Sequence, residues 1–143
     1  MPTFGTQALL MGGLFSALAA VAHLACIALG APAYRFMGAG EKMVHAVESG
    51  RLPPTLVTLT VAGILFIWAV YALAGAGVID RLPFAKLALP AICAVYLGRA
   101  VAFPLLKPVF PGNSQTFWLV SSGICLVVGL VHVYGVISLW ATL

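Results

Sequence analysis

Four long apolar stretches occupy most of this 143-residue chain and decide what it can fold into. They cover residues 8–30, 55–78, 87–103 and 117–139. A helix needs roughly 20 apolar residues to cross about 30 Å of hydrocarbon, and three of the four stretches reach that length. The pattern predicts an all-α fold, a membrane-embedded antiparallel four-helix bundle in which residues 1–143 form one domain.

Composition explains why a water-soluble fold is excluded. Hydrophobic residues make up 63% of the chain and charged residues 7%, whereas a soluble domain has about 45–50% and about 25%. A soluble surface with so few charges would not stay dispersed. The net charge of +4 does not indicate nucleic acid as a partner, because the seven basic residues are scattered along the chain rather than gathered in a patch.

The first connection, residues 31–54, holds half of the charged residues. Within it, Glu41–Ser49 places apolar and polar residues on opposite sides at helical spacing, which predicts a short amphipathic helix in the membrane interface. Gly40 precedes this helix, and Gly50 is suited to end it in a left-handed turn. Pro53 and the proline after it suit the first turn of the second span.

The distribution of Lys and Arg predicts the orientation in the membrane. The first and third connections carry Arg35, Lys42, Arg51 and Lys107, and the second carries Arg81 and Lys86. Because basic residues favour the cytoplasmic side, we expect the first and third connections in the cytoplasm and both termini outside.

The few polar residues inside the spans mark a candidate site, because an ionisable side chain at mid-membrane costs about 2.5–3.5 kcal/mol by insertion scales. With a rise of about 1.5 Å per residue, His23 and Arg99 lie roughly 10 Å from the face of the first and third connections. Ser121 and Ser122 lie at a similar level, and Tyr96 precedes Arg99 by three residues on the same helical face. We predict that these side chains form one half-buried polar pocket beneath the first connection.

The predicted pocket suggests a binding or accessory membrane protein. Its ligand would be a polar or anionic amphiphile or a small metabolite, such as a lipid headgroup or a quinone-like molecule, because a guanidinium group suits carboxylate or phosphate. The candidate ligand-binding residues are Arg99, Tyr96, His23, Glu41, Arg35, Tyr34, Thr58 and Ser122.

Arg99 needs a partner at this depth. Asp80 falls on the opposite face of the membrane, so we hypothesise that Glu41 pairs with Arg99 or that both residues face a bound headgroup. The alternative is that Arg99 extends to the interface and has only a structural role.

The two histidines within the spans do not predict a cofactor or a metal. His23 and His132 differ by roughly 12 Å in depth, too much for both to bind one haem iron. His23 and Cys26 lie one helical turn apart, but two ligands do not make a metal site. We expect His132 to form a hydrogen bond with Tyr71, which lies at a similar depth.

Small residues recur at helical spacing in the first and fourth spans, and such stripes let helices approach closely. They are Gly12, Ser16, Ala19, Ala20, Ala22, His23 and Gly30 in the first span and Ser122, Cys125, Gly129 and His132 in the fourth. We expect these two helices to pack through them.

No catalytic arrangement is evident, because the spans contain no acidic pair and no acid at a suitable depth for a Ser-His-Asp set. An enzyme acting on a lipophilic substrate, with His23 as base, is an alternative to binding. A further alternative is a small proton-coupled transporter that acts as a homodimer, with His23 as its protonatable group. The last alternative is that the chain is a purely structural subunit of a larger complex.

Several segments resemble a family of small bacterial four-span membrane proteins without an assigned activity. These segments are His23–Cys26, Gly30–Glu41, Pro54–Leu59, Tyr96–Arg99 and Ser121–His132. In size and span number the chain is similar to the DoxX-like group, but it lacks the residue pattern of that group. The resemblance covers nearly the whole chain and implies a multi-pass protein of the bacterial inner (plasma) membrane, surrounded by membrane lipid.

Overall fold

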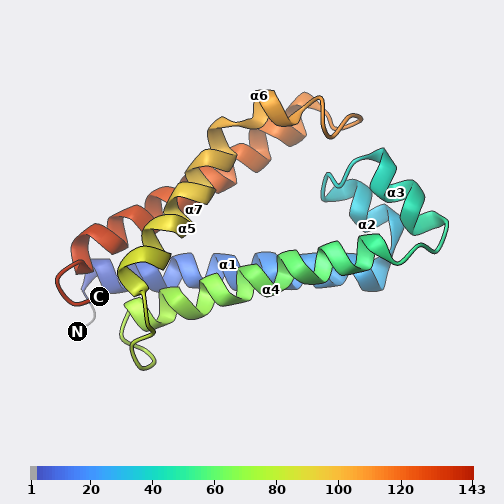
Figure 1. The fold of residues 1–143 in the computed structure, drawn as a ribbon. Coiled ribbons are helices and arrows are strands. Elements are labelled where there is room, and N and C mark those ends of the chain that lie inside the picture. The colour runs from blue at the N-terminus through green and yellow to red at the C-terminus, as the bar shows by residue number, and fades with distance from the viewer. Residues whose placement is uncertain (1–2) are drawn as a thin grey trace.

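A computed structural model describes residues 3–143, which form seven helices and their connections (Figure 1). The helices are α1 (Phe4–Leu29), α2 (Ala31–Phe36), α3 (Glu41–Glu48), α4 (Pro53–Gly75), α5 (Ala85–Val101), α6 (Phe103–Leu106) and α7 (Gln115–Leu139). The described part of the chain contains no strand, which confirms the all-α prediction.

The four long helices begin and end within a few residues of the predicted spans. With 26, 23 and 25 residues, α1, α4 and α7 are each long and apolar enough to span a membrane, whereas α5 has 17 residues. The Thr3 hydroxyl caps α1 by accepting from the Thr6 amide at 3.2 Å. The Ser114 hydroxyl caps α7 by accepting from the Phe117 amide at 3.0 Å. Such caps satisfy amides that the first helical turn leaves free.

The first connection contains the predicted amphipathic helix, because α3 begins directly after Gly40. Gly50 follows α3 with φ of +66°. In this left-handed turn the Gly50 amide donates to the Val47 carbonyl, and the Arg51 amide donates to the Ala46 carbonyl, both at 2.9 Å. The sequence does not predict α2 or α6, because one or two turns are too short to show helical periodicity.

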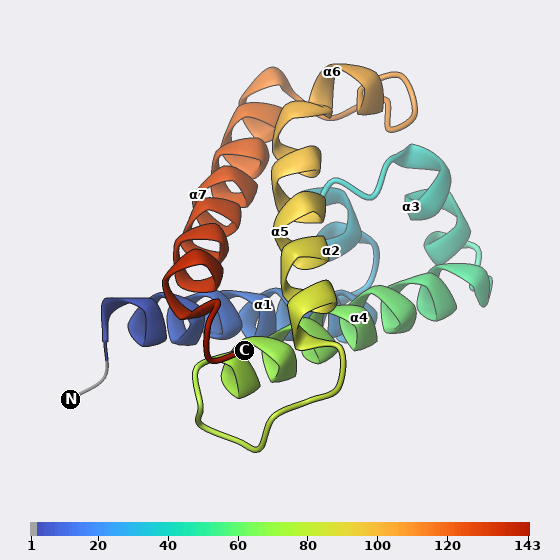
Figure 2. The same ribbon diagram turned by 60° about the vertical axis from the view of Figure 1, so that its left-hand side comes forward.

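The long helices form two antiparallel pairs that diverge. In one pair α1 lies along α4, and in the other α5 lies along α7; we call them the α1/α4 arm and the α5/α7 arm (Figure 1). The arms meet where α1 begins and α7 ends, and there α1 also packs on α7. They separate toward the end that carries α2, α3 and α6 (Figure 2). The four helices therefore do not pack around one common core along their whole length, and the predicted four-helix bundle is confirmed only as an all-helical fold.

A tightly packed apolar core, the junction core, holds the two arms together. Leu9 of α1 is completely buried in it. Cβ atoms built at Gly75 of α4 and Gly135 of α7 would lie 2.9 and 2.6 Å from the Leu9 side chain, so glycine lets three helices meet at one leucine. The junction core consists of Leu9, Ala20, Leu65, Leu89, Ile92, Cys93, Tyr96, Val128 and Val136. The junction core extends from the meeting point of the arms to Ala20 of α1 and Tyr96 of α5, and the arms diverge beyond it (Figure 1).

The predicted packing of small residues between α1 and α7 is confirmed at some positions. Other small residues of α7 face α5 instead. A Cβ at Gly12 of α1 would lie 2.6 Å from the imidazole ring of His132, so the two helices approach closely at this pair. Gly129 of α7 faces α5 instead, since a Cβ there would lie 2.8 Å from Leu97. The small residues of α7 therefore serve two interfaces rather than one.

His132 is completely buried, but the predicted hydrogen bond with Tyr71 is wrong. His132 Nδ1 donates to the Val128 carbonyl oxygen at 2.8 Å, and the ring stacks on Tyr96 with centroids 5.4 Å apart. Its Nε2 has no hydrogen-bond partner within residues 3–143. The Tyr71 hydroxyl donates to the Pro83 carbonyl at 3.1 Å, because Tyr71 lies near the end of α4 and reaches the α4–α5 loop.

A second, smaller core holds the first connection against α1. Cys26 of α1, Tyr34 of α2 and Val44 of α3 are buried in it. The hydroxyl groups of Tyr34 and Thr58 lie 2.9 Å apart, and they reach the Pro54 carbonyl oxygen at 3.5 and 2.8 Å. This network fixes α2 on the first turn of α4. With one core near each end of α1, the region between the arms is left without packing across it.

We expect Gly12→Ala to destabilise the protein by about 1–3 kcal/mol, because the new methyl group would overlap the His132 ring in a packed core. Gly63 is the matched control, since it lies within α4 with no atom near a built Cβ. Gly63→Ala should be neutral or stabilising by up to about 1 kcal/mol. Reversible unfolding in mixed micelles measures both changes, and equal stability of the two variants would contradict the close approach of α1 and α7.

Candidate functional site

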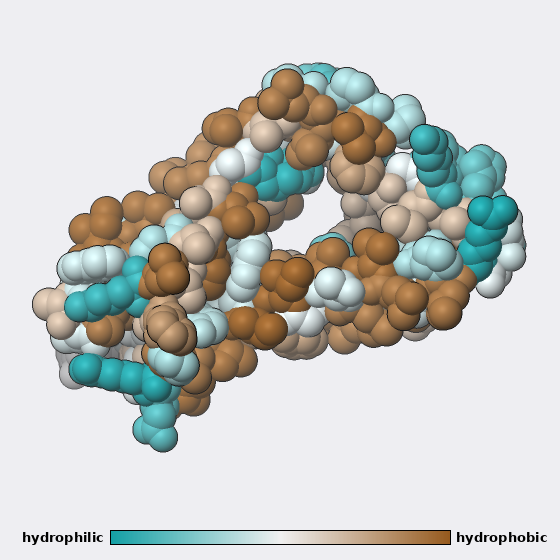
Figure 3. Space-filling model, in the orientation of Figure 1, coloured by the Kyte–Doolittle hydropathy of each residue, from teal (hydrophilic) through white to brown (hydrophobic). Residues whose placement is uncertain are grey.

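A cavity of about 890 Å³ lies between the two arms. Its walls come from α1, the α2–α3 segment, α5, α6, the loop before α7 and the first half of α7. Figure 3 shows an opening that passes between the arms and has a mostly hydrophobic rim. Sites for small molecules in proteins have volumes of about 300–1,000 Å³, so this cavity is large enough to hold a ligand.

Arg99 is the polar centre of the cavity. From the last turn of α5, its guanidinium group donates to the Ser121 hydroxyl at 2.8 Å and to the Ser122 hydroxyl at 3.4 Å. The guanidinium carbon lies 5.2 Å from the centre of the Trp118 ring, which is a cation–π contact. Three side chains of α7 therefore fix the guanidinium group in the cavity wall.

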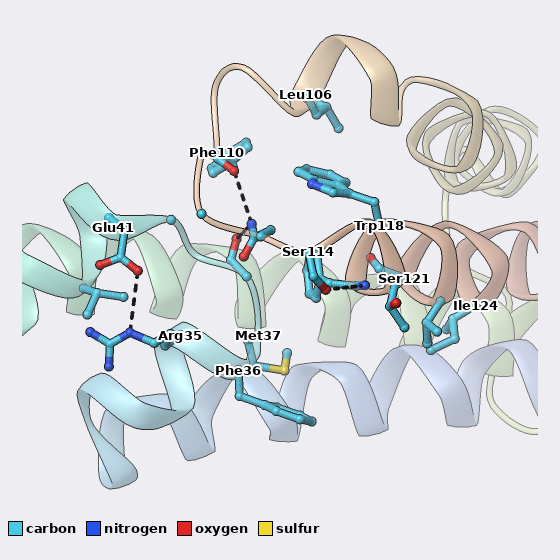
Figure 4. A pocket seen from close by; sticks show the side chains of 18 of the residues that line it. Arg35, Phe36, Met37, Glu41, Leu106, Phe110, Ser114, Trp118, Ser121 and Ile124 are labelled. Atoms are coloured by element: carbon cyan, nitrogen blue, oxygen red, sulfur yellow. Dashed lines mark hydrogen bonds and ion pairs between the residues drawn. The ribbon is translucent and has the colours of Figure 1, made fainter.

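The predicted ion pair between Glu41 and Arg99 is wrong. Within residues 3–143, Arg99 has no carboxylate partner, and Glu41 pairs with Arg35 at 3.6 Å (Figure 4). The reason is local, since Glu41 opens α3 next to α2, which carries Arg35. Both Glu41 and Arg99 line the cavity, as the alternative hypothesis of a bound headgroup requires.

The charges around Glu41 form an exposed network. Arg35 also lies 3.4 Å from Glu48, and His45 Nδ1 lies 3.4 Å from the second oxygen of Glu48. The side chains of Arg35 and Glu48 are 52% and 45% exposed, so solvent screens these pairs and each contributes little to stability. Among the charged residues of the lining, Arg35 and Glu41 offset each other, whereas Arg99 has no carboxylate partner within residues 3–143.

The guanidinium group of Arg99 has donors that the protein does not use. It carries five N–H bonds, and the hydroxyls of Ser121 and Ser122 accept two of them. These hydroxyls orient the group but do not neutralise it. The remaining donors match a carboxylate or a phosphate, which guanidinium groups bind in bidentate geometry. The site is therefore suited to an anionic group.

A set of contacts that we call the bridge joins the two arms at their separated end. Asn113, in the loop before α7, donates from Nδ2 to the Gly38 carbonyl oxygen at 3.1 Å. Gly38 has φ of +75°, and a Cβ there would overlap the ring of Phe117. Gly40 lies against Phe110 on the same side. The bridge therefore closes the cavity at the end that carries α2, α3 and α6.

Most of the remaining lining is apolar or aromatic. It includes Phe36, Met37, Leu106, Phe110, Trp118 and Ile124 (Figure 4). In Figure 4, Trp118 and Ser121 extend from α7, across from Arg35 and Glu41 on the α2–α3 segment. A few charged or polar side chains within an apolar surround are the usual composition of a small-ligand site.

Four of the eight predicted ligand-binding residues line this cavity, namely His23, Arg35, Glu41 and Arg99. Ser122 is buried and meets the cavity through its hydrogen bond with Arg99. The structure thus brings together side chains from the first, third and fourth predicted spans and from the first connection. Their binding of a ligand stays a prediction.

The other three predicted residues, Tyr96, Tyr34 and Thr58, do not line the cavity. The Tyr96 hydroxyl lies 2.8 Å from the Ser16 hydroxyl, a bond between α5 and α1 at the junction core. Tyr34 and Thr58 bond to each other and to the Pro54 carbonyl. Depth along a helix does not determine which way a side chain faces, and these three face neighbouring helices.

His23 lines the cavity from α1, on the arm opposite Arg99. Its Nδ1 donates to the Ala19 carbonyl oxygen at 2.7 Å. This bond fixes the ring and leaves Nε2 as the nitrogen that a ligand or a proton would use.

The aromatic lining is the part of the site that the sequence pattern does not reveal. The Pro111–Ser114 turn has the composition of an ordinary connection between helices. It is flanked by the lining residues Phe110, Phe117 and Trp118. The signal that would have found them is the concentration of aromatic side chains beside this turn, at the level of Arg99. Aromatic residues supply large apolar contact area at sites where ligands bind.

Comparison with known protein families, curated proteins and solved structures finds no match to this chain. The resemblance to small four-span bacterial proteins therefore stays a prediction. Within residues 3–143, no group of three or more His, Cys, Asp or Glu side chains is placed to hold a metal ion. The function has to be inferred from the cavity itself.

A double-mutant cycle tests the partners of Arg99. Arg99→Ala and Ser121→Ala should couple by about 0.5–3 kcal/mol, because residues that share a hydrogen bond are not additive. Arg99→Ala and Glu41→Ala should add to within about 0.3–0.5 kcal/mol, because these side chains do not contact each other. Unfolding in mixed micelles gives both coupling energies, and a Glu41 coupling as large as that of Ser121 would restore the ion pair.

Proposed function

We propose that this chain is a small multi-pass protein of the bacterial inner membrane that binds a polar or anionic amphiphile, or a small anionic metabolite, between its arms. Its role is that of a binding or accessory protein. In this proposal α1, α4, α5 and α7 are four antiparallel spans, and α3 lies in the membrane interface. The observation that supports the proposal is the uncompensated charge of Arg99 in a largely apolar cavity.

The lengths of α5 and α6 are compatible with four spans. With 17 residues, α5 is about 26 Å long, which is the lower limit for crossing a bilayer. A single residue, Ala102, separates it from α6, which extends the helical segment. The hydrogen bond between Asn113 and Gly38 joins the first and third connections, which supports the proposal that both lie on one side of the membrane with two crossings between them.

The depth of Arg99 supports an anionic ligand. Ser121 follows Gln115, the first residue of α7, by six positions, so the guanidinium group lies roughly 9 Å below the start of that helix. An unpaired cation within a span costs up to about 2.5–3.5 kcal/mol by insertion scales. The serine hydroxyls satisfy hydrogen bonds and leave the charge unpaired. A bound anion would compensate the charge and accept the free N–H bonds together.

Binding is favoured over catalysis by the arrangement of the reactive groups. Ser121 accepts from Arg99, and His23 donates to a backbone carbonyl. In the described residues, no hydrogen bond joins a nucleophile to a base at the cavity, which is the arrangement that nucleophilic catalysis uses. Glu41, the acid in the lining, is engaged by Arg35.

A proton-coupled transporter is the second candidate, and the position of His23 in the cavity wall favours it. A histidine titrates near physiological pH and is suited to coupling proton and solute movement. This candidate, acting as a homodimer, requires pH-dependent solute flux in liposomes that His23→Ala abolishes. A binding protein gives no such flux.

The proposed orientation predicts opposite labelling of two connections. We expect Arg81→Cys to react with a membrane-impermeant maleimide in intact spheroplasts and Lys107→Cys to react only after permeabilisation, in a background without Cys26, Cys93 and Cys125. The reverse pattern would mean that the first and third connections face outside. Reaction of both cysteines from the same side would contradict a single fixed four-span topology.

The proposed ligand should depend on Arg99. We expect native mass spectrometry of the gently extracted wild-type protein to show a discrete bound anion, which Arg99→Gln loses, because removing a charge-assisted hydrogen bond costs about 1.5–3 kcal/mol, or roughly tenfold to a hundredfold in affinity. Arg51→Gln is the matched control, since Arg51 lies at a separate, smaller pocket. A bare mass for the wild type, or equal retention in Arg99→Gln, would contradict the proposal.

A further inference from the structure

The cavity is open between the arms and closed at its end. Figure 3 shows the opening passing through the molecule between the arms. At the end, the bridge brings Asn113 to 3.1 Å from the Gly38 carbonyl and the Phe117 ring against Gly38. In the proposed membrane placement, the sides face hydrocarbon and the bridge faces the aqueous surface. A molecule in the bilayer can therefore reach the cavity through the opening between the arms. A molecule in the water phase meets the packed side chains of the bridge instead.

An opening of this kind does not stay empty in a membrane. A space of about 890 Å³ lined by apolar groups would forfeit dispersion contacts if nothing filled it. Phe36, Val120 and Ile124 line the cavity and are exposed in the protein alone, so they offer hydrocarbon contact to whatever enters. The material that surrounds such an opening in a bilayer is lipid chains.

The polar anchor is placed to select among those lipids. Arg99 faces the same space with free N–H donors, and it lies beneath the bridge rather than on the outer surface. A zwitterionic lipid brings a cation together with its phosphate. The exposed acid nearest the bridge, Glu41, is already paired with Arg35. An anionic head without an attached cation therefore complements the site better.

We propose that the ligand is a lipid with a carboxylate or phosphate head on a hydrocarbon chain, and that it enters sideways from the bilayer while the bridge stays closed. This inference rests on the proposed function. The oxyanion binds the free donors of Arg99, and the chain lies on the apolar lining and leaves through the opening between the arms. The bridge keeps the two arms connected at their separated end.

Trp118 provides a direct reporter, because its indole ring lies 5.2 Å from the guanidinium carbon of Arg99 and lines the cavity. The variant Trp68→Phe/Trp140→Phe leaves it as the sole tryptophan. In phosphatidylcholine nanodiscs at alkaline pH, we expect stearate brominated at carbons 6 and 7 to quench this fluorescence, since bromine quenches indole at close approach. Phosphatidylcholine with the same brominated chains should quench at least about tenfold less effectively. Arg99→Gln should remove that difference, because the charge-assisted hydrogen bonds supply it.

A reversible cross-link across the bridge tests the route. A Cβ built at Gly40 lies 3.8 Å from the Phe110 Cβ, a separation that a disulfide spans. The variant Gly40→Cys/Phe110→Cys is compared with itself, oxidised and reduced, so any strain at Gly40 is common to both states. We expect brominated stearate to quench Trp118 equally in both states. Loss of quenching in the oxidised state alone would show access through the bridge and overturn the sideways route.

Soluble anions distinguish the source of the oxyanion. Inorganic phosphate and acetate, added to the water phase at equal concentration, should displace brominated stearate at least about tenfold less effectively than unbrominated stearate does. If phosphate or acetate binds in an Arg99-dependent way and stearate does not, the lipid inference fails and the proposed function stands. If neither stearate nor the soluble anions respond to Arg99→Gln, the proposed function itself fails. Native mass spectrometry of the unmodified chain in the same nanodiscs reads the same outcomes should the single-tryptophan variant not fold.

Discussion

The close approach of α1 to α7 is the constraint on which the rest of the structure depends. It is made by glycines that face bulky partners, with Gly12 against the His132 ring and Gly135 against Leu9. Since α1 packs along α4 and meets α7 through its first half, the long helices of the two arms pack together at one end, and only the bridge connects the arms at the other. The second half of α1 is then left to carry the first connection and to present His23 to the space between the arms.

The serine pair explains how a cation is held in such a space without being neutralised. An acid in the place of Ser121 or Ser122 would form an internal salt bridge with Arg99 and leave no charge for a ligand. Hydroxyl groups at 2.8 and 3.4 Å orient the guanidinium plane, and the Trp118 ring supports it. Preorganised donors of this kind bind an anion without first having to be ordered.

The features that could be predicted from the sequence are those that depend on residues close together in the chain. The ends of α3 and of the long helices depend on apolar runs, capping hydroxyls and Gly50, all of which are legible in the chain. The common level of His23, Arg99 and Ser121 follows from counting residues along straight helices. The partners of Arg99 and His132 do not, because they depend on how far the helices turn about their axes and on where the arms cross. The divergence of the arms could not be predicted from the sequence either. An apolar helix face that packs on another helix has the same residue pattern as one that would contact lipid.

The location of the cores has a consequence for biogenesis. The α1/α4 arm contains its own small core around Cys26, Tyr34 and Val44, and no residue of α5 or α7 takes part in that core. In the α5/α7 arm, α5 packs on α7 across a short connection. Contacts between segments that are close in the chain form early in folding. In the proposed four-span placement, each arm is a helical hairpin that can insert by itself and dock with the other afterwards, as in two-stage membrane folding. The cavity is lined by both arms, so it forms only when they dock, and a chain divided at the α4–α5 loop would carry it in neither half.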